Sequence, residues 1–142
     1  MFAKLDHVAI SVRDMEGAIA FYRDIIGMEK VFDYEFGDKL GRVINEPAVS
    51  AHVVHMKLGE MIVELFDYRQ PKGREPRPDD RQCDYGLTHI GFWVNDFWGT
   101  YRDLVAKGVR LLGEPVELRP NVFVAYFHGA EYEILEIREI VK

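Results

Sequence analysis

Two histidines and two glutamates recur at equivalent places in the two halves of this 142-residue chain. His7 opens the run HVAISV and His89 opens HIGFWV, while Glu64 and Glu136 lie inside apolar runs near the end of each half. An unpaired carboxylate is costly to bury, so each glutamate either faces water or pairs with a cation or metal ion. A lone His or Glu on a strand is more often structural, but one of each in both halves favours a shared chemical role.

The histidines belong to an internal repeat. The segments 6–27 and 88–108 match each other: in both, a Val follows the His after five residues and an Asp follows it after seven. Each copy predicts a short strand and then a helix, because Asp14 and Asp96 suit the N-cap position and apolar residues recur at helical spacing after them. Gly27 and Gly108 suit the helix ends, where glycine readily takes a positive φ.

Strand-like segments follow each helix. We expect strands at 29–36, 53–58 and 61–66 in the first half, and at 109–112, 122–127 and 133–140 in the second. The prediction is an α+β fold of two tandem βαβββ modules, residues 1–70 and 87–142. A polar, proline-containing linker loop at 71–86 joins them.

Alternation along the first strand of each module predicts two different faces. His7 shares its side with Ala9 and Ser11, and His89 shares its side with Gly91 and Trp93, whereas the opposite sides are apolar and suit packing against a helix. We therefore expect a cupped mixed sheet with helices on its outer face and a polar cavity on its inner face. The small residue beside each histidine leaves room next to the imidazole.

Composition excludes several functional classes. A net charge of −6 has the wrong sign for a general nucleic-acid or anionic-membrane binder. The one cysteine, Cys83, allows neither an intramolecular disulfide nor a thiolate metal cluster. Because the sequence contains neither a signal-peptide pattern nor an apolar stretch of about 20 residues, we expect a cytoplasmic protein that binds neither membrane nor nucleic acid.

The sequence resembles the vicinal oxygen chelate superfamily, which includes glyoxalase I, methylmalonyl-CoA epimerase, extradiol dioxygenases and bleomycin or fosfomycin resistance proteins. The motifs that carry the resemblance are LDHVAISVRDMEGAIAFYRDIIGMEKV, KLGEMIVELFD, GLTHIGFWVNDF and YFHGAEYEILEIRE. The pattern is most similar to epimerase-like and glyoxalase I-like members. The resemblance implies a divalent metal ion held by four residues, His7, Glu64, His89 and Glu136. One departure is the sequence Gly129 to Tyr132, which stands where the family usually has a DPDG-like turn.

Two imidazoles and two carboxylates suit Zn, Co, Ni, Mn or Fe and leave positions open for substrate oxygens. Such a centre acts as a Lewis acid on a carbonyl, so that a neighbouring C–H can lose its proton through an enolate or enediolate. Glu136 is the first candidate for the base, with Glu64 returning the proton. The expected activity is that of an epimerase or isomerase, or of a glyoxalase-type lyase, on a small carbonyl substrate such as an acyl-CoA or a thiol adduct.

Two alternatives stay open. Without Glu64, the remaining His7, His89 and Glu136 would form the two-histidine, one-carboxylate triad of non-haem iron dioxygenases. A metal-free binding or resistance protein would instead hold a planar ligand between aromatic side chains. His52 and His55 are expected on opposite strand faces, which prevents joint chelation, and Glu46 is a weaker candidate for an additional base.

A homodimer is expected as well, because several late strands expose hydrophobic residues. The metal site then lies within one chain or is shared between two chains.

Overall fold

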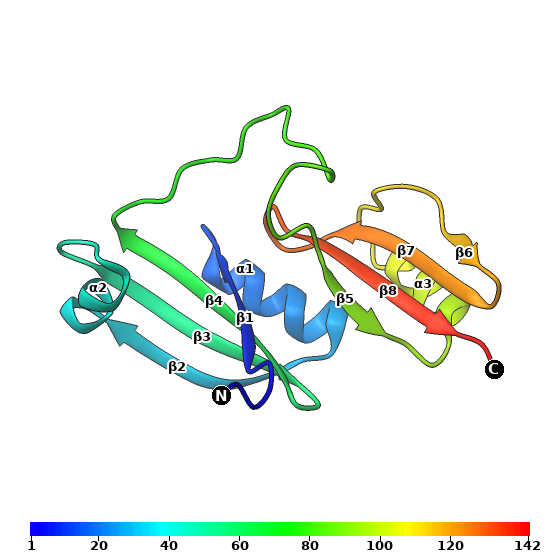
Figure 1. Ribbon diagram of the computed structural model, residues 1–142, viewed down its shortest axis with the longest axis horizontal. Coiled ribbons are helices and arrows are strands. Elements are labelled where there is room, and N and C mark those ends of the chain that lie inside the picture. The colour runs from blue at the N-terminus through cyan, green and yellow to red at the C-terminus, as the bar shows by residue number, and fades with distance from the viewer. The chain divides into compact units, whose positions relative to one another are not determined.

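Each half of the chain forms its own four-stranded sheet, and the computed structural model describes all residues from Met1 to Lys142. Contacts within the chain divide it into unit 1, Met1–Glu75, and unit 2, Pro76–Lys142. The predicted α+β fold with two βαβββ modules is confirmed, and Figure 1 shows the same order of elements in both units.

Unit 1 has six elements besides a π-helix that continues its first helix. They are β1 (His7–Ser11), α1 (Met15–Ala20) with the π-helix η1 (Phe21–Ile26), β2 (Glu29–Phe36), α2 (Asp38–Ile44), β3 (Ser50–Leu58) and β4 (Met61–Gln70). The strand order is β1-β4-β3-β2, in which β1 runs parallel to β4 and the other neighbours are antiparallel. The first strand of the unit therefore pairs with its last.

Unit 2 repeats this topology. It contains β5 (Ile90–Trp93), α3 (Phe97–Ala106), β6 (Val116–Arg119), β7 (Val122–His128) and β8 (Ile134–Ile140). The strand order is β5-β8-β7-β6, again with a parallel pair between the first and last strands. The second sheet is thus built like the first.

The predicted helix ends are confirmed. The Asp14 carboxylate accepts a hydrogen bond from the Gly17 amide at 3.0 Å, and the Asp96 carboxylate accepts one from the Gly99 amide at 2.8 Å. These contacts satisfy amides of the first helical turn that have no partner within the helix. Gly27 ends η1 with a φ of 86°.

Alternation separates the two faces of each sheet as expected. On β1, Val8 and Ile10 are less exposed than His7, Ala9 and Ser11. The same face of the unit 1 sheet carries four of its most buried side chains, Val54, Met56, Val63 and Leu65. Helix α1 contacts β4 and lies across one side of the sheet (Figure 1). This leaves the histidine face of the sheet free of α1.

Two segments differ from the prediction. The segment 109–112 forms only an isolated bridge from Leu111 to Phe127, and the second strand of that module is β6 further along. Gly113 and Pro115 come directly after the segment, and proline has no amide for a strand ladder. Helix α2 was not expected. Its Leu40 packs on a cluster formed by Val49, Ala51 and Val53.

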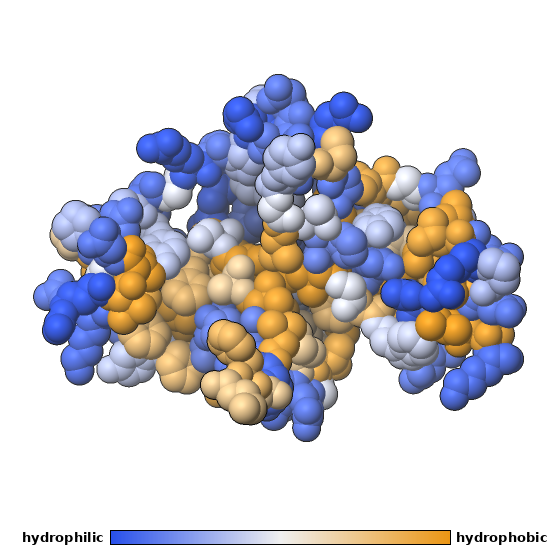
Figure 2. Space-filling model, viewed as in Figure 1, coloured by the Kyte–Doolittle hydropathy of each residue, from blue (hydrophilic) through white to orange (hydrophobic).

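The segment 71–86 is exposed throughout. It leaves β4 as a long green loop in Figure 1, and hydrophilic side chains cover this region in Figure 2. None of the helices combines the length and the apolar character that crossing a membrane requires.

Candidate functional site

The parallel strand pair in each unit sets a histidine beside a glutamate. On unit 1, Ala9 of β1 is the register partner of Glu64 on β4, and on unit 2, Gly91 of β5 is the partner of Glu136 on β8. The histidine lies two residues before the small residue on the same face, so the two units present the same arrangement. The glutamates therefore point to the face opposite the buried core, where the sequence predicted a polar cavity.

In unit 1 the Glu64 carboxylate contacts two imidazoles. Its Oε2 lies 3.3 Å from His7 Nε2, and its Oε1 lies 2.8 Å from His55 Nε2. The Glu64 side chain is only 14% exposed. Phe32 stacks on the His55 ring at 4.4 Å between centroids, which fixes the ring that holds the carboxylate.

The hydrogen bond at His7 Nδ1 influences whether His7 Nε2 carries a proton or a lone pair. His7 Nδ1 lies 2.9 Å from the carboxylate of Asp6, closer than Nε2 lies to Glu64, and in the tautomer with the proton on Nδ1 it donates a hydrogen bond to Asp6. The hydrogen bond to His7 is the main reason that the pKa of Asp6 is lowered. In a neutral His7, Nε2 is then a lone pair that faces the Glu64 oxygen. Two acceptors at this separation require a proton or a cation between them.

Unit 2 contains the equivalent pair. His89 Nε2 lies 2.9 Å from Glu136 Oε2, and His89 Nδ1 lies 2.9 Å from the hydroxyl of Thr88. Glu136 is the one buried charged residue of the chain, with 8% of its surface exposed. Its Oε2 lies 3.5 Å from the position that a Cβ on Gly91 would occupy, an ordinary contact distance, so the small residue leaves space for the carboxylate beside it.

Sequence reasoning did not identify His55 as a site residue. His52 and His55 do lie on opposite faces as predicted, since His52 pairs with Asp33 at 2.7 Å while His55 pairs with Glu64. Their spacing along β3 does not reveal that Glu64 lies beside His55 on the neighbouring strand β4. In unit 2 the position equivalent to His55 is Tyr126, which is the register partner of Glu136 as His55 is of Glu64.

A tyrosine close to each glutamate stays protonated. Burial raises the pKa of Tyr126, the charge of Glu136 raises it further, and the charge of Arg138 opposes this effect. Burial and the charge of Glu64 likewise raise the pKa of Tyr68. The Tyr126 ring meets the His89 ring edge to face at 5.0 Å. Each carboxylate therefore has a neutral phenol in its electrostatic environment.

The unusual turn before β8 has a defined conformation. The Glu133 carboxylate accepts hydrogen bonds from the amides of Ala130 and Glu131 at 2.9 and 3.1 Å, and the Gly129 amide donates to the Glu133 carbonyl at 2.9 Å. These bonds replace what a DPDG-like turn would supply. After this turn the chain enters β8, where Glu136 is the register partner of Gly91 as Glu64 is of Ala9.

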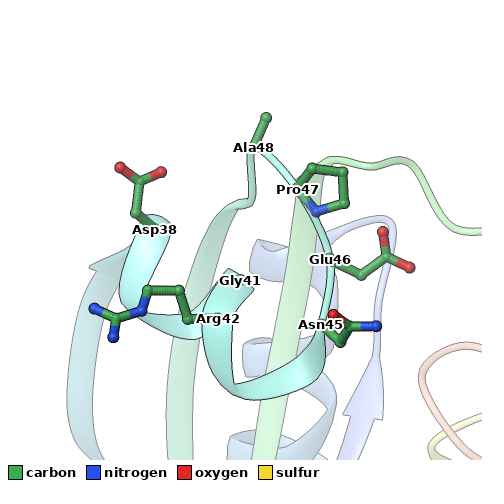
Figure 3. A pocket seen from close by; sticks show the side chains of 7 residues that line it. All are labelled: Asp38, Gly41, Arg42, Asn45, Glu46, Pro47 and Ala48. Carbon is green, nitrogen blue, oxygen red and sulfur yellow. The ribbon is translucent and has the colours of Figure 1, made fainter.

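A separate hollow of about 410 Å³ lies beside α2 and the loop that follows it. Its lining includes Asp38, Arg42, Asn45 and Glu46. Figure 3 shows the Asp38 and Arg42 side chains on one side and those of Asn45 and Glu46 on the other. The role of Glu46 as an additional base stays a prediction.

The structure brings together His7 with Glu64 and His89 with Glu136. No group of three or more His, Cys, Asp or Glu side chains is arranged to hold a metal ion, so each unit by itself supplies an incomplete set of ligands. The assembly of all four residues around one ion stays a prediction. The two sequence-equivalent pairs are what the fold itself positions.

The chain contains two copies of a βαβββ unit, and each copy has one His and one Glu on the same face of its sheet. This places it in the class of proteins that are built from paired modules. The chain belongs to the Glyoxalase/Bleomycin resistance protein/Dioxygenase superfamily, whose sequence profile matches residues 4–121. The resemblance found in the sequence motifs is thereby confirmed.

The curated relatives include several epimerases. The chain is 33% identical over 115 residues to a 2-epi-5-epi-valiolone epimerase from an Actinomyces species, a match that covers 77% of this chain and 62% of that protein. It is 28% identical over 148 residues to the ethylmalonyl-CoA/methylmalonyl-CoA epimerase of Cereibacter sphaeroides, covering 99% and 100% of the two chains. The chain spans less than two thirds of the length of several other curated relatives, human mitochondrial methylmalonyl-CoA epimerase among them.

Solved structures share the fold over nearly the whole chain. A glyoxalase family protein from Bacillus cereus superposes with a TM-score of 0.88 at 22% identity, covering 100% of this chain and 97% of that one. The fosfomycin resistance protein FosX of Listeria monocytogenes, solved with Mn(II) and sulfate, superposes with a TM-score of 0.63 at 17% identity, covering 98% and 93%.

We predict that Glu133→Ala loosens the turn before β8. Loss of two charge-assisted hydrogen bonds should lower the free energy of unfolding by about 1–3 kcal/mol and speed hydrogen exchange at the Ala130 and Glu131 amides. Urea unfolding and amide exchange measured by NMR check this. Glu114→Ala, which removes an exposed glutamate from another loop of unit 2, is the control, and equal effects of the two substitutions would contradict the role given to Glu133.

Proposed function

We propose that this protein is a divalent-metal-dependent epimerase or isomerase that moves a proton on the carbon next to a substrate carbonyl. The observation that carries the proposal is the repeated His–Glu pair, held in the same strand register in both units. A structural role for one such pair is ordinary. Two pairs on equivalent faces, in a chain whose relatives include several epimerases, favour one shared centre.

The donor atoms fit a divalent ion. Ligands at about 2.1 Å from a metal ion lie about 3.0 Å apart at a right angle and about 3.4 Å apart at the tetrahedral angle. The His–Glu separations of 3.3 and 2.9 Å fall at about these values. With its proton on Nδ1, His7 would also offer the lone pair of Nε2 to the ion. Mixed nitrogen and oxygen donors suit Zn, Co, Ni, Mn or Fe.

The four residues His7, Glu64, His89 and Glu136 would hold the ion, and a bound ion would act as a Lewis acid that stabilises the negative charge developing on the substrate as the C–H proton leaves. Glu136 is the proposed base, since it is the most buried carboxylate and lies beside the open Gly91. Glu64, in its protonated form, would donate a proton to the opposite side of the same carbon, while Glu136 keeps the proton it removed. The imidazole of His55 holds the Glu64 carboxylate in one orientation, which keeps the proton donor in place.

The proposed substrate class is a small molecule with a carbonyl next to the reacting carbon. Among the relatives, one name contains a ketone and the other contains the acyl-CoA esters of substituted malonates. Both substrates have an acidic C–H beside a carbonyl group. A glyoxalase-type reaction on a thiol adduct would use the same residues for the same proton transfer.

We predict that the purified protein binds one divalent ion per chain and that His7→Ala and His89→Ala each weaken that binding by more than about 100-fold. Replacing an outer partner of a metal ligand already costs roughly 10–100-fold, and a direct ligand should cost more. Calorimetry with Zn(II) and Mn(II) measures the binding. The loaded protein should also exchange deuterium from solvent into methylmalonyl-CoA, and Glu136→Gln should abolish that exchange.

Two outcomes would contradict the proposal. Purified protein that contains iron and consumes oxygen with a catechol would assign the dioxygenase reaction instead. A folded protein that binds no divalent ion would assign a metal-free binding function.

The two histidines of β3 provide a matched comparison. We expect His55→Leu to weaken divalent-metal binding by about 10–100-fold, because Glu64 loses the partner that orients it. His52→Leu, on the opposite face of the same strand, should leave metal affinity unchanged, since His52 pairs with Asp33 instead. Equal losses in the two variants, measured by calorimetry, would show that His55 acts only through the stability of β3.

A homodimer is part of the proposal, and mixing variants tests how its chains share the ligands. One variant lacks His7 and Glu64, and the other lacks His89 and Glu136. If one chain supplies all four ligands, the mixture binds no more metal than either variant alone. Recovery of binding on mixing would mean that the two pairs come from different chains.

A further inference from the structure

Arg138 is a cation on the same face of β8 as Glu136 and has no assigned role. It lies two residues after Glu136, and alternation along a strand places both side chains on one face. Its Nε is buried and has no hydrogen-bond partner. Buried donors in native proteins are nearly always paired, so an unpaired one indicates a missing partner.

The neighbouring acidic groups are engaged elsewhere. Glu136 contacts the imidazole of His89 at 2.9 Å. Glu139, the next acidic residue along β8, accepts a hydrogen bond from the Phe97 amide at 2.7 Å, at the start of α3. The guanidinium therefore has donors to offer on the site face of the unit 2 sheet.

Arg138 lies next to an exposed side chain on the site face. Its register partner on β5 is Trp93, which is 59% exposed. Its charge is felt at the Tyr126 hydroxyl, where it opposes the effect of Glu136 on the pKa. Successive same-face residues on a strand lie about 7 Å apart. Arg138 and the proposed base Glu136 thus start from Cα atoms about 7 Å apart on one face of β8.

Unit 1 has no such cation at the equivalent position. Counting two residues on from Glu64 gives Phe66, which stacks on Tyr68 at 5.5 Å. The two units therefore match at the His–Glu pair but differ one step further along the strand. Unit 2 offers a charge there, and unit 1 offers an aromatic surface.

We propose that Arg138 binds a carboxylate of the substrate and selects for substrates in which a carboxylate lies close to the reacting carbon. The inference rests on the proposed function and narrows its substrate class to malonate-like acids and esters. A planar guanidinium can donate two parallel hydrogen bonds to a carboxylate, and one of them can come from Nε, which has no other partner. A neutral ketone would leave the guanidinium unpaired.

The experiment measures the binding of three probes to the zinc-loaded protein by calorimetry: malonate, its neutral diamide malonamide, and inorganic phosphate. Arg138→Gln should weaken malonate binding by about 10- to 100-fold, the effect of losing hydrogen bonds to a charged group. Malonamide binding should change by less than about twofold, because the amide of the introduced glutamine can still donate to a neutral oxygen. Arg119→Gln, at an exposed position on β6, should bind malonate like the unchanged protein.

A second variant keeps the inference testable if the glutamine variant does not fold. Arg138→Lys keeps the charge but loses the fork of donors, so we expect a loss of malonate affinity smaller than that of Arg138→Gln. Malonate affinity equal to that of the unchanged protein in this variant and in Arg138→Gln would overturn the proposal, as would equal losses for malonate and malonamide. A loss confined to phosphate would overturn the choice of a carboxylate.

Zinc affinity is measured first in every variant, which separates this inference from the proposed function. A protein that binds no zinc contradicts the metal-dependent function. Normal zinc binding together with a malonate affinity that the Arg138 substitutions leave unchanged contradicts only the carboxylate site.

Discussion

The architecture of each unit depends on holding a carboxylate inside an apolar strand. Glu64 and Glu136 are flanked by residues of the core, and their side chains are only 14% and 11% exposed. A carboxylate in such a position needs a polar or cationic partner. The parallel neighbour strand provides it, because its histidine and its small residue leave the carboxylate a polar contact and space. The helices are confined to the other face, where the apolar side chains are, except for α2.

The two units each contain this His–Glu pair, but the residues around the two pairs differ. Where unit 1 places His55 against its glutamate, unit 2 places Tyr126. Where unit 1 places Phe66, unit 2 places Arg138. Helix α2 covers part of the inner face of unit 1, and unit 2 has a bridge and a short strand in the corresponding region. The two units thus have the His–Glu pair in common, and these differences give each pair its own surroundings.

Most of the fold was predictable because its signals are local. Strand alternation gave the faces of β1 and β5, and the Asp and Gly residues gave the helix ends. Helix α2 was missed because it is short and owes its position to contacts of Leu40 with residues that follow it. The strand predicted at 109–112 was wrong because Gly113 and Pro115 outweigh a short apolar run.

The His–Glu pairs came from the repeat together with the resemblance, but their neighbours depend on register. Nothing in the local sequence says that His55 lies opposite Glu64, since that requires the antiparallel pairing of β3 with β4. Arg138 was visible in the motif EILEIRE, two residues after the glutamate. Its significance depends on the buried Nε, which only the packing of the second sheet reveals.

The pairing of the first strand with the last also governs how each unit folds. His7 and Glu64 lie near opposite ends of the sequence of unit 1, and His89 and Glu136 do so in unit 2. Each pair therefore forms only when the first and last strands of its unit come together. Such non-local contacts are slow to form, because the loop between them must be closed before they contribute any stability. A ligand that bridges the pair would stabilise the last contact to form, and its binding would therefore report that folding is complete.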